Sequence, residues 1–117
     1  MPKITKVNCK SINIFGTCLQ GYLLCTYDKL VDRLGKPFES DGYKTDAEWA
    51  IEFADGTIAT IYNWKDGKNY CGVEGKDVED ITEWHIGGSK KEVEAWVNDY
   101  VKTPWPVFDD LRQEAQF

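Results

Sequence analysis

Apolar and polar residues alternate over residues 47–53, which predicts a strand with one buried face. Asp55-Gly56 follows directly and favours a hairpin turn into a second strand over 58–64. A two-residue turn would place Phe53 opposite Ile58. The hairpin therefore predicts an apolar sheet face that packs beneath a helix.

Other segments carry helix and strand signals. Thr26 is a candidate N-cap for a short helix that Gly35 ends. Apolar residues at helical spacing predict a second helix over 89–102, where Ser89 and Glu92 fit a capping box. The remaining strands are expected over three ranges, namely 4–15 and 19–25, which would form a hairpin, and 81–86.

Together these elements predict an α+β fold, an antiparallel sheet of about four to six strands with two helices packed on one face. Residues 1–102 are expected to form this single domain, with 103–117 as a C-terminal tail, because Thr103-Pro104-Trp105-Pro106 interrupts the helical pattern. Residues 66–80 are rich in glycine and charge, so we expect a long polar loop there.

Composition narrows the classes of function. The chain has 117 residues and a formal net charge of −6, which disfavours sequence-independent binding to nucleic acid. Its 4 cysteines lack the close pairing of zinc sites, and His85 is its 1 histidine, so neither a metal nor a cofactor is expected. No signal peptide or membrane-length apolar run is evident, which predicts a soluble cytoplasmic protein with reduced thiols.

A candidate anion site lies where the strand over 81–86 gives way to the predicted helix. Gly87 and Gly88 would leave backbone N–H groups facing a phosphate, with Ser89 capping the helix and Lys90 and Lys91 adding positive charge. The alternative is an ordinary connection between strand and helix, because the full pattern of a nucleotide-binding loop is missing.

Aromatic and amide side chains suggest a base-binding site nearby. Trp64 and Trp84 are candidates for stacking on a base, Asn63 for reading its edge, and Lys65 for adding charge. The alternative is that these aromatic residues belong to the core. His85 is a candidate ligand contact, and no convincing nucleophile accompanies it for catalysis.

Several short motifs give the chain a resemblance to known proteins. They are Tyr27-Asp28-x-Leu30-Val31, Gly35-Lys36-Pro37, Asp46-Ala47-Glu48-Trp49, Asp55-Gly56, Ala59-Thr60-Ile61-Tyr62-Asn63-Trp64-Lys65-Asp66-Gly67 and Glu83-Trp84-His85-Ile86-Gly87-Gly88. In these motifs the chain resembles a group of small tailed-bacteriophage proteins, over residues 4–100. The resemblance implies a viral origin and, by analogy, a role against bacterial defence, but it carries over no catalytic residue.

The leading hypothesis is a phage anti-defence protein that sequesters a small nucleotide signal in the host cytoplasm without catalysis. The alternative is an acidic inhibitor that covers a host defence protein with residues 73–83 or with the Trp105 tail. A hydrolase centred on His85 is the third hypothesis. Self-association through the tail is a further expectation, because 5 tryptophans are generous for a core of this size.

Overall fold

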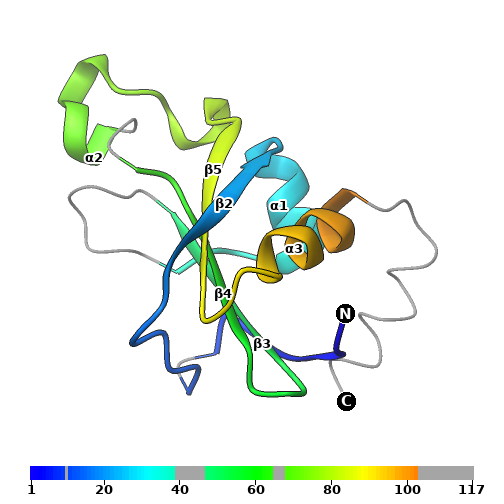
Figure 1. Ribbon diagram of the computed structural model, residues 1–117. Coiled ribbons are helices and arrows are strands. Elements are labelled where there is room, and N and C mark those ends of the chain that lie inside the picture. Colours follow the sequence, from blue (N-terminus) through cyan, green and yellow to red (C-terminus); the bar gives the residue numbers. More distant parts are fainter. Residues whose placement is uncertain (10, 39–46, 65–67, 103–117) are drawn as a thin grey trace.

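The computed structural model describes residues 1–9, 11–38, 47–64 and 68–102. The elements in chain order are β1 (Ile4–Val7), β2 (Cys18–Leu24), α1 (Tyr27–Leu34), β3 (Glu48–Phe53), β4 (Ile58–Tyr62), α2 (Lys68–Cys71), the 3-10 turns η1 (Gly72–Glu74) and η2 (Val78–Asp80), β5 (Glu83–Gly88) and α3 (Val93–Lys102). The strands form one antiparallel 5-stranded sheet in the order β1-β3-β4-β5-β2. Helices α1 and α3 pack on the same face of this sheet (Figure 1), so the predicted α+β architecture is confirmed.

Two fully buried tryptophans hold α1 onto the sheet. The rings of Trp49 on β3 and Trp84 on β5 meet edge to face, with centroids 5.3 Å apart. Trp49 Nε1 donates to the carbonyl of Gly35 at 2.8 Å, and Trp84 Nε1 donates to the carbonyl of Cys25 at 2.9 Å. Because these carbonyls flank the two ends of α1, the indoles combine apolar burial with satisfied polar groups.

Helix α1 has the boundaries that its sequence predicts. The hydroxyl of Thr26 accepts a hydrogen bond from the Lys29 N–H at 3.2 Å, which confirms the N-cap. At the other end Gly35 takes a positive φ of 81° and donates to the Val31 carbonyl at 2.8 Å. Leu30 and Leu34 face the core from this helix.

The β3–β4 hairpin forms as predicted, but its loop has three residues, 54–56, instead of two. The Gly56 N–H donates to the Phe53 carbonyl and the Phe53 N–H donates to the Thr57 carbonyl, both at 2.9 Å. Gly56 has a φ of 88°, as a turn that closes with a left-handed residue requires. Glu52, not Phe53, therefore lies opposite Ile58.

This shift of one residue reverses the two faces of β4, because successive side chains on a strand point to opposite sides. Ala59 and Ile61 face the helices, whereas Thr60 and Tyr62 point to the other side of the sheet. The predicted register would have buried both of these polar side chains in the core.

The predicted hairpin between residues 4–15 and 19–25 is wrong. Strand β1 pairs with β3 and β2 pairs with β5, so the two strands lie at opposite edges of the sheet. Asn8 directs the chain away from β1 with a φ of 51°, and its Oδ1 accepts a hydrogen bond from the Ala50 N–H at 2.9 Å. Nearness in sequence was a poor guide here because each strand finds its partner far along the chain.

Helix α3 begins at Val93, four residues after the predicted start at Ser89. The Ser89 N–H donates to the Ile58 carbonyl, and the Ser89 hydroxyl accepts from the Ile58 N–H, both at 3.0 Å. Ser89 therefore extends the pairing of β5 with β4 and does not cap a helix. Val93, Val97 and Val101 bury the inner side of α3.

Helix α3 also covers part of the exposed edge of β2. Glu94 Oε2 accepts a hydrogen bond from the Tyr22 N–H at 3.0 Å, and Asn98 Nδ2 donates to the Tyr22 carbonyl at 3.3 Å. Such contacts occupy edge groups that would otherwise be open to another strand. No helix within the described ranges has the length and apolar composition that a membrane span requires.

Candidate functional site on the open face of the sheet

The face of the sheet that points away from α1 and α3, here called the open face, is only partly covered. At one end Ile12 and Phe38 pack on Ala50 and Ile58 in a small second core. At the other end, toward the last residues of β4, aromatic side chains reach the surface, and Trp64 is 42% exposed. This end of the open face holds the candidate site.

A depression of about 250 Å³ lies there, across β2, β5, β4 and β3. The residues that line it are Thr17, Cys18, Glu48, Thr60, Tyr62, Trp64 and Gly87. Gly87 forms part of its floor, because a Cβ atom added there would lie 2.6 Å from Thr60 Oγ1 and 3.3 Å from Tyr62 Cε1. The absence of a side chain at Gly87 therefore keeps the depression open.

The Thr60 hydroxyl is a polar group that the depression leaves available. Thr60 is 3% exposed, and none of the described residues forms a hydrogen bond with its side chain. The hydroxyl oxygen is not sealed from solvent, so a ligand in the depression can form a hydrogen bond with it.

Four rings form a row along the open face beside the depression. The centroid of Tyr22 lies 5.2 Å from that of His85, His85 lies 5.5 Å from Tyr62, and Tyr62 lies 6.3 Å from Trp64. All three pairs meet edge to face, so they hold each other in place and leave ring faces for further contacts. Burial raises the pKa of the Tyr62 phenol, and the nearby Glu48 carboxylate raises it further.

His85 interacts in this row with two tyrosine rings. Among the described residues, no hydrogen bond or ion pair involves its imidazole, so no carboxylate there orients it for proton transfer. A His85-centred hydrolase thus lacks the partner that the third hypothesis requires within the described chain. The position of His85 suits a ligand contact better.

Two of the predicted base-binding residues are structural. Trp84 is 0% exposed and belongs to the core, because residue 84 points to the helix face of β5. Asn63 is also 0% exposed, and its Oδ1 accepts a hydrogen bond from the Ala47 N–H at 3.2 Å. Of the predicted stacking residues, Trp64 is therefore the one that reaches the surface.

The predicted phosphate cradle does not form. Gly87 and Gly88 lie within β5, whose backbone pairs with β4 on one side and with β2 on the other. Their N–H groups therefore serve an interior strand and not the N-terminus of a helix. Ser89 is also occupied, through its contacts with Ile58.

The predicted basic residues are separated from Trp64. Strand β4 does pair with β5, but in antiparallel orientation, so Lys90 and Lys91 follow the end of β5 that is remote from the end of β4. Ser89 follows His85 by four positions along the strand, a span of about 13 Å. Lys90 Nζ instead pairs with Asp55 Oδ2 at 3.2 Å, and Lys65 lies outside the described residues.

Sequence reasoning did not assign four of the lining residues to a ligand site, namely Thr17, Cys18, Glu48 and Thr60. With the predicted two-residue turn, Thr60 and Tyr62 would have faced the core. A hairpin loop of three residues at 54–56 would have revealed Thr60, because it places residues 58, 60 and 62 on the open face together with Glu48. It gives no information about Thr17 and Cys18, which belong to the start of β2.

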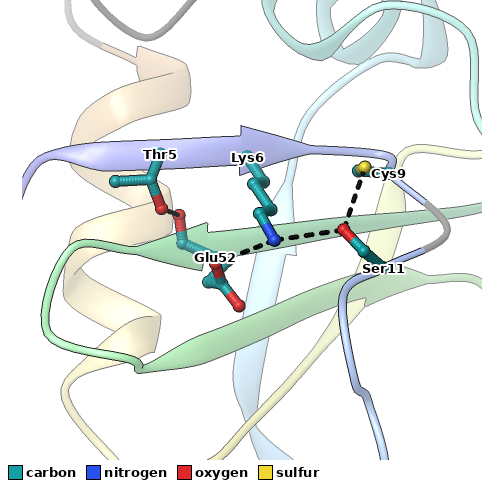
Figure 2. Close-up of polar contacts among 5 residues, drawn as sticks. All are labelled: Thr5, Lys6, Cys9, Ser11 and Glu52. Carbon is teal, nitrogen blue, oxygen red and sulfur yellow. Dashed lines mark hydrogen bonds and ion pairs between the residues drawn. The ribbon is translucent and has the colours of Figure 1, made fainter.

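Figure 2 shows a second polar cluster, at the β1 edge. Lys6 Nζ donates to Ser11 Oγ at 3.1 Å and lies 3.7 Å from Glu52 Oε2, while Cys9 Sγ lies 3.2 Å from Ser11 Oγ. The hydrogen bond with Ser11 lowers the pKa of the exposed Cys9 thiol. Because Lys6 acts as a donor and ion-pair partner, it supplies no base for Ser11, and the cluster ties the loop after β1 to β3.

A larger hollow of about 630 Å³ lies between β1 and α1. Its apolar lining comes from Val7, Val31 and Leu34, together with the ring of Tyr100. Among the described residues that line this hollow, Tyr100 is the one aromatic residue, whereas both Tyr62 and Trp64 line the depression on the open face. Within the described ranges, no group of three or more histidine, cysteine or acidic side chains has a metal-binding arrangement.

Comparison of the chain with protein-family models, with curated proteins and with solved structures finds no match. The functional argument therefore rests on the chemistry of the open face.

Proposed function

We propose that this protein binds a small nucleotide without transforming it and holds the base of that nucleotide in the depression of the open face. The observation that carries the proposal is the meeting of the Tyr62 and Trp64 rings with the Thr60 hydroxyl in one hollow. Base stacking on an aromatic ring contributes about 1–3 kcal/mol, and a buried hydroxyl can fix the orientation of the base.

The size of the depression favours a base over a whole nucleotide. Sites for drug-sized ligands occupy roughly 300–1,000 Å³, whereas this depression holds about 250 Å³. The sugar and phosphates would extend over the sheet surface. Lys65, which follows Trp64 in the sequence, remains the candidate for a phosphate contact.

The biological role that we propose is sequestration of a nucleotide signal by a phage in the host cytoplasm. It is supported by the resemblance to small phage proteins and by the surroundings of His85, which contacts two aromatic rings and has no hydrogen-bond partner among the described residues. Binding without turnover is what sequestration requires.

Calorimetric titration with cyclic di- and trinucleotides and ADP-ribose derivatives tests this proposal. We expect micromolar binding that Trp64→Ala abolishes and that Phe15→Ala leaves unchanged, because Phe15 is 93% exposed and does not line the depression. Ligand recovered intact by chromatography would agree with binding alone. The absence of any heat at high-micromolar ligand would refute nucleotide binding.

A second candidate function, inhibition of a host defence protein, is favoured by the outer edge of β2. Leu19, Tyr22 and Leu24 are 47%, 51% and 67% exposed there, and Glu83 beside Leu24 is exposed as well. Exposed apolar residues with an acidic margin suit a protein partner with a basic rim.

Capture of a specific protein from bacterial lysate would support this second function if Leu24→Asp abolished it and Trp64→Ala did not. Loss of capture at high salt would point to the acidic residues over 73–83. The tail around Trp105 is the other predicted docking element, and it lies outside the described residues. Capture that neither Leu24→Asp nor added salt affects would contradict a role for this edge.

A further inference from the structure

Three of the four rings on the open face share one line across the sheet. Tyr22 on β2 lies opposite His85 on β5, and His85 lies opposite Tyr62 on β4. Neighbouring strands are about 4.8 Å apart, so the two tyrosines are separated by about 10 Å, with the imidazole between them. The depression adjoins the Tyr62 end of this line, and Tyr22 marks the other end, on an outer strand of the sheet.

Tyr22 offers a second stacking surface, outside the depression. The residue is 51% exposed, and its ring meets the His85 ring at an interplanar angle of 89°. One such contact occupies at most one ring face, so another face remains open to a planar ligand. The hydrogen bonds between Tyr22 and α3 use its backbone N–H and carbonyl and do not involve the ring.

His85 supplies a polar group between the two stacking surfaces. A neutral imidazole has one N–H donor and one acceptor nitrogen. None of the described residues forms a hydrogen bond or an ion pair with this imidazole. Its N–H can therefore be donated to a phosphate oxygen of a ligand that crosses from one surface to the other.

We infer that the ligand of this protein contains two bases joined through a phosphodiester. One base enters the depression beside Tyr62 and Trp64. The linking phosphate lies over His85, and the second base stacks on Tyr22. This inference rests on the proposed function, since it names the class of nucleotide that the proposed function leaves open.

The length of the line sets the number of bases. Bases that stack on each other are about 3.4 Å apart, so bases at the two ends of this line are splayed, as is common for bound single strands. Among the described residues, Tyr22 has one ring contact, with His85, so the line ends there. The net charge of −6 also disfavours a longer polyanion, whereas a linear dinucleotide has one phosphodiester charge.

Titration of the full chain with AMP, the linear dinucleotide ApA and cyclic di-AMP, and with GMP, GpG and cyclic di-GMP, tests this inference without any mutation. Stacking of one more base is worth roughly five- to a hundredfold in affinity, so we expect at least one two-base ligand to bind about tenfold more tightly than its mononucleotide. ApA carries less negative charge than AMP, so charge would not explain its tighter binding. The linear and cyclic ligands distinguish the two sources of such a molecule.

Variants locate the second base. Tyr22→Ala should remove the advantage of the two-base ligands and leave the affinity for AMP and GMP unchanged, whereas Trp64→Ala should weaken every ligand. His85→Phe keeps a ring but removes the N–H, and it should weaken the two-base ligands roughly tenfold. Leu19→Ala is the matched control, because Leu19 is a 47% exposed residue of the same strand that does not line the depression.

The possible failures are distinguishable. Equal affinity for one-base and two-base ligands, or binding of ADP-ribose derivatives alone, would overturn the two-base inference and leave nucleotide binding intact. So would a two-base advantage that survives Tyr22→Ala. A further large gain with the trinucleotide ApApA would overturn the limit of two bases. No binding of any of these ligands would overturn both the inference and the proposed function.

Discussion

Adjacent glycines on β5 point to opposite faces of the sheet, and an alanine at each should give opposite results. A Cβ at Gly88 would lie 2.5 Å from Val93 Cγ2 and 2.9 Å from the Ile58 carbonyl oxygen. That carbonyl cannot shift easily because it accepts the Ser89 N–H at 3.0 Å, and Val93 could shift only if α3 moved away from the sheet. Overpacking of this kind costs about 1–3 kcal/mol, and we expect Gly88→Ala to lose about 2–3 kcal/mol of unfolding free energy.

Gly87→Ala affects the open face instead. Its Cβ would meet Thr60 Oγ1 at 2.6 Å and Tyr62 Cε1 at 3.3 Å. These are side chains at the border of a hollow, so they can shift, and lower chain entropy in the unfolded state offsets about 0.4–1 kcal/mol. We expect a stability loss of about 1 kcal/mol or less, but at least a tenfold loss of ligand affinity, because the methyl group fills the floor of the depression.

Thermal and urea unfolding of both variants, followed by tryptophan fluorescence, measures the difference. With roughly 4 °C of melting temperature per kcal/mol for a domain of this size, Gly88→Ala should melt about 8–12 °C below the parent chain and Gly87→Ala about 4 °C below it or less. Equal losses, or a larger loss for Gly87→Ala, would refute the assignment of the two faces.

Three further outcomes follow from single contacts. Thr26→Ala should cost about 1 kcal/mol through loss of the α1 cap, measured by urea unfolding. Hydrogen bonds from Thr57 lower the pKa of the exposed Asp55 carboxyl to about 2. The contribution of this carboxylate to stability is therefore complete above pH 4 and is lost as the pH falls toward 2. Asp55→Asn should make the unfolding free energy depend less steeply on pH between 4 and 2, and an unchanged dependence would contradict this. Glu94→Ala should uncover the Tyr22 N–H on the β2 edge and increase light scattering at high protein concentration, whereas a monodisperse variant would argue against that protection.

Local signals in the sequence were sufficient to predict those elements whose boundaries are determined by neighbouring residues in the chain. Thr26 and Gly35 define α1 because a cap needs only its neighbouring backbone. The alternation over residues 47–53 also placed Trp49, Ile51 and Phe53 in the core correctly. Both features are properties of a short stretch of chain.

Features that depend on pairing between distant segments were not predictable in this way. Ser89 with Glu92 has the composition of a capping box, yet its hydroxyl accepts from the Ile58 N–H, 31 residues away in sequence. Gly87 and Gly88 suggested a turn, but both lie in a central strand where small residues admit Thr60 on one face and Val93 on the other. The residues predicted to form one site therefore lie in two places. Trp64, His85 and Gly87 lie at the open face, whereas Lys90 lies beside Asp55.

Residue-resolved NMR during titration with GMP tests the central claim most directly, because it locates binding as well as detecting it. The account predicts shifts in the Trp64 indole, the His85 ring and the amides of Gly87 and Thr60, all of which lie in or beside the depression. Shifts confined to residues 89–91, or no shifts at high-micromolar GMP, would contradict it.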